Sequence, residues 1–233
     1  MTIDIFRKLK LKFYEKNQEY KKHWNKEYFY NYAYEELQKK KKVLDLGCGV
    51  GYFLKLGNGD IVGIDTNYAS LKESEAYSNK LVNGDILQLP FSDASFDGIN
   101  CSHVIEHLIP NDAYRLLEEM NRVLEVGGTL VISTPVLWVG FFEDFTHIKP
   151  YYPEAIMHYY GKKNNQITKA PIDCLYEIKG IKWRYAKVPL ENFLLPRAGV
   201  MNTLLLLLMQ FLSNIGFVKY SRTGYTMILR KIR

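Results

Sequence analysis

The stretch Val43-Leu-Asp-Leu-Gly-Cys-Gly-Val-Gly-Tyr-Phe53 decides the fold of this chain. An apolar run ends in Asp45, and glycine then stands at positions 47, 49 and 51. That order predicts a buried strand, a tight turn and the start of a helix. Glycine lets a ligand approach the backbone closely because no Cβ stands in the way. The alternative is a strand, turn and helix that bind nothing.

A second predicted strand, 60–65, ends in Asp65 and is followed by Thr66. A carboxylate there can accept hydrogen bonds from a ribose diol, so a nucleoside-containing cofactor is expected across the first two βα units. The dinucleotide fingerprint needs glycine at its first, third and sixth positions. Here the sixth position, counted from Gly47, is Tyr52, and glycine stands at the fifth. Asp45 would also repel a pyrophosphate, whereas a sulfonium cofactor with an amino-acid tail tolerates it.

The run from Asp45 to Gly51 resembles motif I of the class I S-adenosylmethionine-dependent methyltransferases. Later segments resemble the same family in its order: 83–91 its third acidic loop, 95–108 its fourth strand and exit, and 127–135 its fifth strand. The resemblance is close over residues 41–150. It implies S-adenosylmethionine as cofactor, with Asp85 and the backbone N–H of Ile86 at the adenine. The cofactor-binding residues expected on this basis are Asp45, Gly47, Cys48, Gly49, Gly51, Asp65, Thr66, Asp85, Ile86 and Ser102.

Periodicity and breakers predict an α/β fold. It is a Rossmann-like, doubly wound, mainly parallel seven-stranded sheet with helices on both faces, plus N-terminal helices and a C-terminal insertion or lid. We expect a helical cap over 1–40, the cofactor-binding domain over 41–233, and acceptor-side insertions over 136–215. The first strand is expected after the basic run 39–42, ending at Asp45, and the others at 60–65, 80–83, 97–102, 129–134, 175–187 and 224–231. Helices are expected over 5–40, after Gly51, over 67–78 and over 112–124, the last capped by Asn111 and stopped by Gly127.

In such a sheet, ligands sit at the carboxyl ends of the strands, where the strand order reverses. Asp45, Asp65, Asp85 and Ser102 all fall at expected strand ends. Their convergence is therefore a geometric expectation, independent of the family resemblance.

Two histidines are candidates for the catalytic step. His103 follows the fourth strand directly and can take a proton near neutral pH, or only shape the pocket. His147 lies in a loop after the fifth strand, where it can orient or deprotonate an acceptor with Asp144 and Tyr151, or simply cap a following helix. The pair Glu106-His107 is expected to be structural. We expect no metal site, because no ligand spacing in the sequence indicates one.

Composition limits the remaining choices. The chain has 233 residues, a formal net charge of +6 and an isoelectric point near 9.0. Three widely spaced cysteines and an N-terminus without a signal-like apolar region favour a reduced, cytoplasmic location. The apolar run 203–212 is too short to span a bilayer, which needs about 20 residues. It is expected to be a buried helix, or a face for a homodimer partner, a lipid-like acceptor or the membrane surface.

Three functions remain open from the sequence. The first is methyl transfer to an O or N atom of a small-molecule, sugar or lipid-linked acceptor. The second, less favoured, is an RNA methyltransferase that uses the basic N-terminal helices. The third is a binding protein that keeps the cofactor fold without catalysis.

Overall fold

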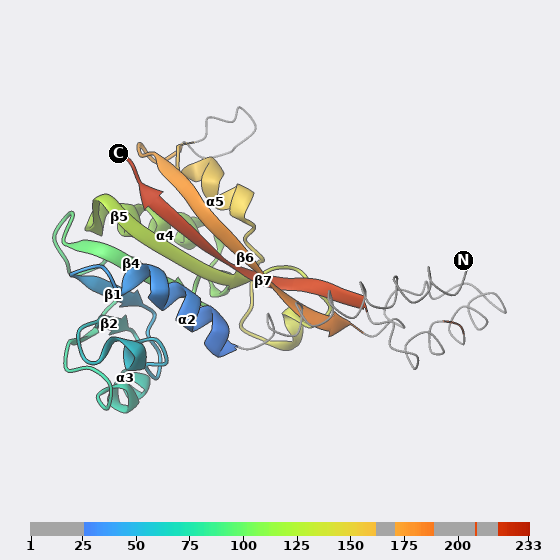
Figure 1. Cartoon of the computed structure of the whole chain (residues 1–233), viewed down its shortest axis with the longest axis horizontal. Coiled ribbons are helices and arrows are strands. Elements are labelled where there is room, and N and C mark those ends of the chain that lie inside the picture. The colour runs from blue at the N-terminus through green and yellow to red at the C-terminus, as the bar shows by residue number, and fades with distance from the viewer. Residues whose placement is uncertain (1–25, 162–170, 189–207, 209–218) are drawn as a thin grey trace, which may run out of the picture.

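The computed structural model describes residues 26–161, 171–188, 208 and 219–233 (Figure 1). The helices expected over 5–25 lie outside these residues, as does the apolar run 203–212 apart from Leu208. No helix within the described ranges is long and apolar enough to cross a bilayer.

Seven strands form one sheet in the order β3-β2-β1-β4-β5-β7-β6. The strands are Val43–Leu46 (β1), Val62–Asp65 (β2), Leu81–Asn83 (β3), Phe96–Ser102 (β4), Leu124–Pro135 (β5), Tyr176–Val188 (β6) and Lys219–Lys231 (β7). β1 to β5 pair in parallel, and β7 is antiparallel to both of its neighbours, β5 and β6. The order reverses at β1, which lies between β2 and β4, so the doubly wound prediction is confirmed and a crevice is expected there.

Helices cover both faces of the sheet (Figure 1). They are α2 (Lys26–Leu37), α3 (Tyr68–Ser74), α4 (Pro110–Val123) and α5 (Pro153–Tyr159), with the 3-10 turns η1 (Leu54–Gly57), η2 (Ile105–His107) and η3 (Phe141–Glu143). Successive side chains of β5 pack into two different buried clusters, one on each face of the sheet. Val131 packs in one buried cluster with Ala33 and Leu37 of α2, whereas Leu130 and Ile132 pack in the other with the apolar face of α4. A strand whose successive side chains point to opposite faces links two cores.

The prediction of a full helix after Gly51 is wrong. Only the single 3-10 turn η1 forms there, and Asn58 follows it with a left-handed φ of 54°. Two glycines, Gly57 and Gly59, flank that asparagine and favour a stop over helix propagation. α3 is likewise shorter than the expected 67–78 helix, and its first turn is capped by the Asn67 side chain.

α4 also begins differently from the prediction. The cap position is Ile109, which makes no side-chain bond, and Pro110 occupies the first turn, so Asn111 lies inside the helix. β5 starts at Leu124, directly after the helix. Gly127, with a φ of 83°, lies inside that strand and does not stop the helix. Ala113, Leu116, Leu117, Met120 and Val123 form the buried face of the helix.

β6 and β7 pair over their whole length as antiparallel strands, and their outer ends, 185–188 and 219–222, pair with one another beyond the end of β5 (Figure 1). β7 therefore starts earlier than the expected residue 224. The inner face of α2 packs on the sheet, and the domain boundary expected at residue 40 stays a prediction, as does the acceptor-side role of 136–215.

Candidate functional site

The glycine turn after β1 has a backbone that side chains disfavour. Gly47, Gly49 and Gly51 have φ angles of 69°, 52° and 85°. A Cβ at position 47 would come within 2.5 Å of Val104, whereas a Cβ at position 49 would meet nothing within 4 Å. The turn is thus packed against the protein at its first glycine and open at its second. A ligand can fill the space over Gly49.

The amides of this turn are already used. Gly47 and Cys48 both donate to the carbonyl of Ile64, and Gly49 donates to Oδ2 of Asp65 at 2.8 Å. A pyrophosphate site needs free N–H groups at the start of a helix. Here the turn leads into the short η1 and offers space, so it suits a nucleoside better than a pyrophosphate.

Asp65 is fixed at the end of β2 by backbone donors. Its Oδ1 accepts from Asn67 N at 2.8 Å, and its Oδ2 accepts from Gly49. The amide of Asn83, at the end of β3, donates to the carbonyls of both Asp65 and Thr66, each at 3.0 Å. Each carboxylate oxygen keeps lone pairs that can accept ribose hydroxyls. The Thr66 carbonyl is engaged, and the residue itself is exposed.

Asp45 lies in β1, 3% exposed, and accepts a hydrogen bond from Asn100 Nδ2 at 2.8 Å. Burial raises the pKa of Asp45 to about 7; the Asn100 bond works against the shift, and the charge of Asp65 adds to it. Asn100 Oδ1 is buried without a hydrogen-bond partner among the described residues. The ionised carboxylate is therefore costly here until a cationic partner arrives, and the orphaned oxygen can accept from an ammonium group. Both features fit the amino-acid end of the expected cofactor.

The expected adenine loop follows β3. Asp85 is exposed, its Oδ1 accepts from Leu87 N at 2.8 Å, and Ile86 packs at the edge of the main core. Arg122 of α4 donates to the carbonyls of Leu89 and Phe91 at 3.0 and 2.7 Å, which ties the loop to the helix.

Tyr30 of α2 closes over the end of β4. Its phenol is hydrogen-bonded to Ser102, and its ring stacks on Tyr52 with centroids 6.2 Å apart. Burial raises the pKa of Tyr30, and the charge of Asp45 adds to this effect. The sequence placed Ser102 here but gave no sign of Tyr30. An aromatic stripe on a helix indicates only a packed face.

His103 follows β4 with a left-handed φ of 57° and is engaged at both ring nitrogens. Arg184 Nη1 lies 2.8 Å from Nε2, and Glu106 Oε1 lies 3.0 Å from Nδ1. Because arginine can only donate, Nε2 must accept, so the proton resides on Nδ1 and is donated to Glu106. The basic nitrogen of His103 is therefore occupied in this structure.

Arg184, from β6, has further donors. Its Nε and Nη2 are buried without a hydrogen-bond partner among the described residues. Burial lowers its pKa, while the charge of Glu106 acts to raise it. The guanidinium lies between the Phe29 ring, 5.6 Å from its centroid, and Gly224, where a Cβ would overlap it. Arg184 lies more than 80 positions from His103 in the sequence, so motif spacing could not assign it to this site.

Glu106 is fully buried in η2. Its other oxygen, Oε2, accepts from the Thr134 hydroxyl at 3.0 Å. Burial acts to raise the pKa of Glu106, but the hydrogen bond donated by His103 leads the contributions that outweigh it and lower the pKa. Glu106 thus carries a negative charge at the carboxyl end of the sheet.

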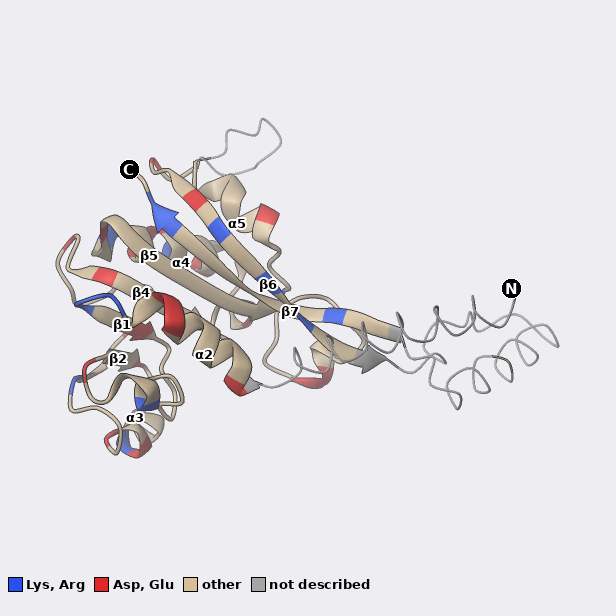
Figure 2. Cartoon of the chain, in the orientation of Figure 1, with Lys and Arg blue, Asp and Glu red and all other residues tan. Residues whose placement is uncertain are grey.

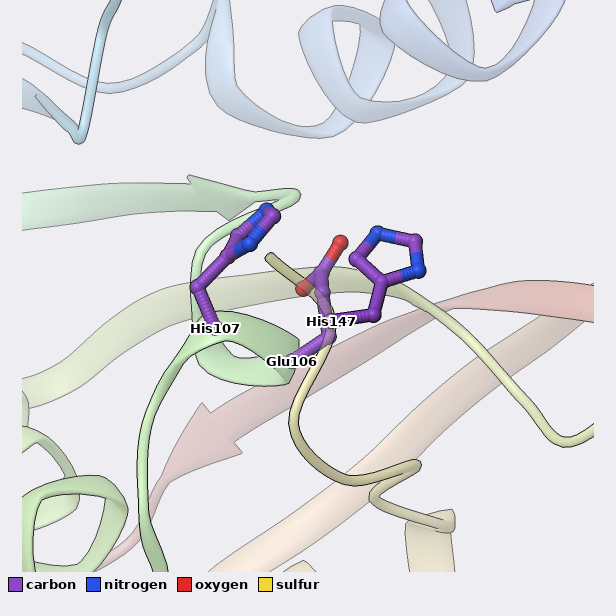
Figure 3. Close-up of side chains that lie close together, drawn as sticks. All are labelled: Glu106, His107 and His147. Carbon is purple, nitrogen blue, oxygen red and sulfur yellow. The ribbon is translucent and has the colours of Figure 1, made fainter. Parts of the chain in front are cut away.

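The loop expected to carry His147 brings this residue to Glu106 and His107 (Figure 3). His147 Nδ1 lies 2.6 Å from the carbonyl of Phe141, so the residue does not cap α5, which begins at Pro153 after Tyr152. Asp144 accepts from the amide and hydroxyl of Thr146, which lower its pKa. Tyr151 donates to the Leu108 carbonyl at 3.0 Å, so its hydroxyl holds a loop.

Comparison with known proteins gives consistent findings. Residues 44–132 match the family model described as "Methyltransferase domain". A malonyl-[acyl-carrier protein] O-methyltransferase of Legionella pneumophila is 32% identical over 104 residues, which cover 40% of this chain and 36% of that protein. A demethylmenaquinone methyltransferase of Staphylococcus aureus is 33% identical over 144 residues, 54% of this chain and 55% of that protein. The chain thus spans about half the length, or less, of these relatives.

Solved structures share the fold. A S-adenosylmethionine-dependent methyltransferase from Archaeoglobus fulgidus superposes with a TM-score of 0.58 at 23% identity, covering 94% of this chain and all of that one. The N-methyltransferase NodS of Bradyrhizobium japonicum, in complex with S-adenosyl-L-homocysteine, gives a TM-score of 0.57 at 12% identity over 88% and 86% of the two chains. Such low identities show the fold alone.

Proposed function

We propose, from the match of residues 44–132 to the methyltransferase-domain model and from the geometry of the site, that this chain transfers a methyl group from S-adenosylmethionine to an O or N atom of a small-molecule, sugar or lipid-linked acceptor. The observation that carries the proposal is the glycine turn. Four of its amides are bonded within the protein, one of them to the carboxylate of Asp65, and the turn is open over Gly49.

The bound cofactor supplies an electrophilic methyl group on a sulfonium. The chain itself holds and orients the reactants: Asp65 for the ribose, Asp45 and Asn100 for the amino-acid end, and Asp85 with Ile86 for the base. Holding reactants at near-attack distance can contribute on the order of 7 kcal/mol to lowering the barrier.

On the acceptor side, His103, Glu106 and Arg184 support binding of an electron-rich acceptor. The two unpartnered donors of Arg184 suit an oxygen-bearing, preferably anionic group. The loop after β5 exposes large apolar side chains: Leu137, Val139, Phe142 and Phe145. These favour an acceptor with an apolar part. The relatives named for a carrier-bound malonyl group and for demethylmenaquinone make such acceptors reasonable choices for a screen.

The first test is calorimetric titration with S-adenosylmethionine, S-adenosylhomocysteine and NADH. We expect micromolar binding of the first two and none of NADH. Gly49→Ala should abolish or strongly weaken this binding, because the alanine Cβ would occupy the open space over the turn that the cofactor is expected to fill. Gly59→Ala is the matched control: that glycine is also left-handed with open space around it, but it lies outside the turn. An equal loss of cofactor affinity in both variants would show that backbone strain, and not the open space over Gly49, controls binding.

Asp65→Ala tests the ribose assignment separately. A folded Asp65→Ala protein with unchanged cofactor affinity would remove that assignment. An acceptor screen with radiolabelled methyl would then separate an enzyme from a non-catalytic binding protein, which would take the cofactor and transfer nothing.

An RNA acceptor has less support in the described part of the chain. α2 carries three acidic residues, Glu27, Glu35 and Glu36, against one lysine. In Figure 2, red and blue segments are interspersed on the described elements, with no continuous blue tract in that view. Saturable tRNA binding that falls steeply with salt would support the RNA alternative.

A homodimer or peripheral membrane contact through 203–212 and a cytoplasmic location remain further proposals.

A further inference from the structure

We propose that Glu106, His107 and His147 bind a divalent transition-metal ion near the carboxyl ends of β4 and β5. One potential ligand atom from each residue lies within 4.8 Å of the other two. The residues come from separate segments: Glu106 and His107 from η2 after β4, and His147 from the loop after β5. In Figure 3 the carboxylate lies between the two imidazole rings, and all three side chains point toward the space below α2.

The hydrogen bonds leave a suitable nitrogen on each histidine. His147 Nδ1 lies 2.6 Å from the Phe141 carbonyl, which can only accept, so His147 carries its proton on Nδ1. The Thr146 hydroxyl donates to Asp144 at 2.6 Å, so it must accept from His107 Nδ1, which lies 2.9 Å away. Both rings therefore keep a lone pair on Nε2, and His147 Nε2 lies 3.8 Å from Asp144 Oδ2, which is beyond hydrogen-bond distance.

These contacts also match the surroundings of bound metals in proteins. A metal-ligating histidine commonly donates its other N–H to a carbonyl or carboxylate, which fixes the tautomer and the ring orientation. Here the Phe141 carbonyl fulfils that function for His147, and the Thr146 carbonyl and hydroxyl fulfil it for His107. The ring centroids are 5.0 Å apart, with the planes tilted by 53°.

The donor set indicates the class of metal. Two imidazoles and one carboxylate suit Zn²⁺, Mn²⁺ or Fe²⁺ better than Mg²⁺ or Ca²⁺, which prefer oxygen ligands. Glu106 supplies the negative charge, and each of its oxygens retains a lone pair beyond the bonds to His103 and Thr134. Three protein ligands leave at least one coordination position open.

The role of the metal, unlike its binding, rests on the proposed methyltransferase function. His103 has its basic nitrogen occupied by Arg184, so it is not poised to accept a proton from an acceptor. A bound metal would hold an acceptor oxygen at the open position and lower its pKa.

The test begins with protein stripped by a chelator and dialysed. Titration with Zn²⁺ by calorimetry should show one equivalent bound at micromolar affinity or tighter. Co²⁺ should give visible absorption bands characteristic of nitrogen and oxygen ligands. His107→Ala and His147→Ala should each weaken binding at least tenfold, whereas His158→Ala, which removes an imidazole from α5 outside the cluster, should leave it unchanged.

Several outcomes would overturn the proposal. They are no binding of Zn²⁺ or Co²⁺ by the wild-type protein, binding that survives both cluster variants, or an equal loss in His158→Ala. Circular dichroism checks the fold, and His147→Gln, which keeps more of the side-chain bulk, is used if the alanine variant unfolds.

S-adenosylmethionine titration of the same samples separates this proposal from the proposed function. Metal-ligand variants that keep cofactor affinity but lose Zn²⁺ support both proposals. Protein that binds Zn²⁺ through the cluster but never binds S-adenosylmethionine would retain the metal site and reject the methyltransferase role.

Discussion

At the scale of single residues, the candidate site combines carboxylates from β1 and β2 with side chains from elements distant in sequence. Asp45 lies in β1 and Asp65 ends β2, as expected. Their functional roles remain predictions. Tyr30, Arg184 and Thr134 could not be found, because each reaches the site from an element distant in sequence. Asn100 did leave a signal: it is the one polar side chain in the buried run 98–101 of β4.

The raised pKa of Asp45, about 7, makes cofactor affinity pH-dependent. A cationic ligand prefers the ionised carboxylate, so affinity for S-adenosylmethionine should fall as the pH drops below about 7, by up to about tenfold per unit. Calorimetry between pH 5.5 and 8.5 checks this. Asp45→Asn should bind weakly with a flatter pH profile, and a flat profile in the wild-type protein would contradict the assignment.

The same shift affects stability with a definite sign. The folded-state pKa of Asp45, about 7, is above its unfolded value near 3.9, so its contribution is fully present below about pH 4 and is lost as pH rises through about 7. Asp45→Asn should therefore raise the free energy of unfolding at pH 8 while it weakens binding. Urea unfolding at pH 8 measures the change; a less stable Asn variant would show that the carboxylate is not strained.

At the scale of elements, the sequence predicted whether a segment is a helix or a strand better than it predicted the residues at which that segment begins and ends. Apolar runs and the periodic face of α4 identified strands and helix correctly, because burial on a face dictates those patterns. The prediction of a helix after Gly51 was wrong, because Gly57 and Gly59 around the left-handed Asn58 end the chain's helical turn after η1. α4 starts two residues early because Pro110 suits a first helical turn better than its interior.

Arg122 should be the main connection between α4 and the expected adenine loop. It also pairs with Glu119 and Asp93, at 2.7 and 2.9 Å. Arg122→Leu should lower the free energy of unfolding by about 2 kcal/mol, because the Leu89 and Phe91 carbonyls lose a charged donor. The affinity for S-adenosylmethionine should fall severalfold. Arg115→Leu, on the exposed side of the same helix, is the control, and equal effects would contradict a specific role of Arg122.

At the scale of the whole molecule, a buried lysine joins the end of β7 to the end of α4. Lys231 Nζ donates to the carbonyls of Asn121 and Leu124, at 2.6 and 2.8 Å, and burial lowers its pKa. Lys231→Met should cost about 2 kcal/mol of unfolding free energy, because helix-terminal carbonyls lose a cationic donor. Lys179→Met, which breaks only an exposed pair with Glu177, should change stability little in the same urea titration.

The strand order also has a consequence for how this protein is made. β7 follows every other described strand in the chain, yet it inserts between β5 and β6. β6 therefore reaches the ribosome exit first and has no partner strand in the sheet until residues 219–231 have been synthesised. During that interval Arg184, carried by β6, cannot rest against Gly224. The contact between Arg184 and Gly224 therefore forms only after residues 219–231 have emerged, and slowing translation of that segment should lengthen the life of a protease-sensitive intermediate.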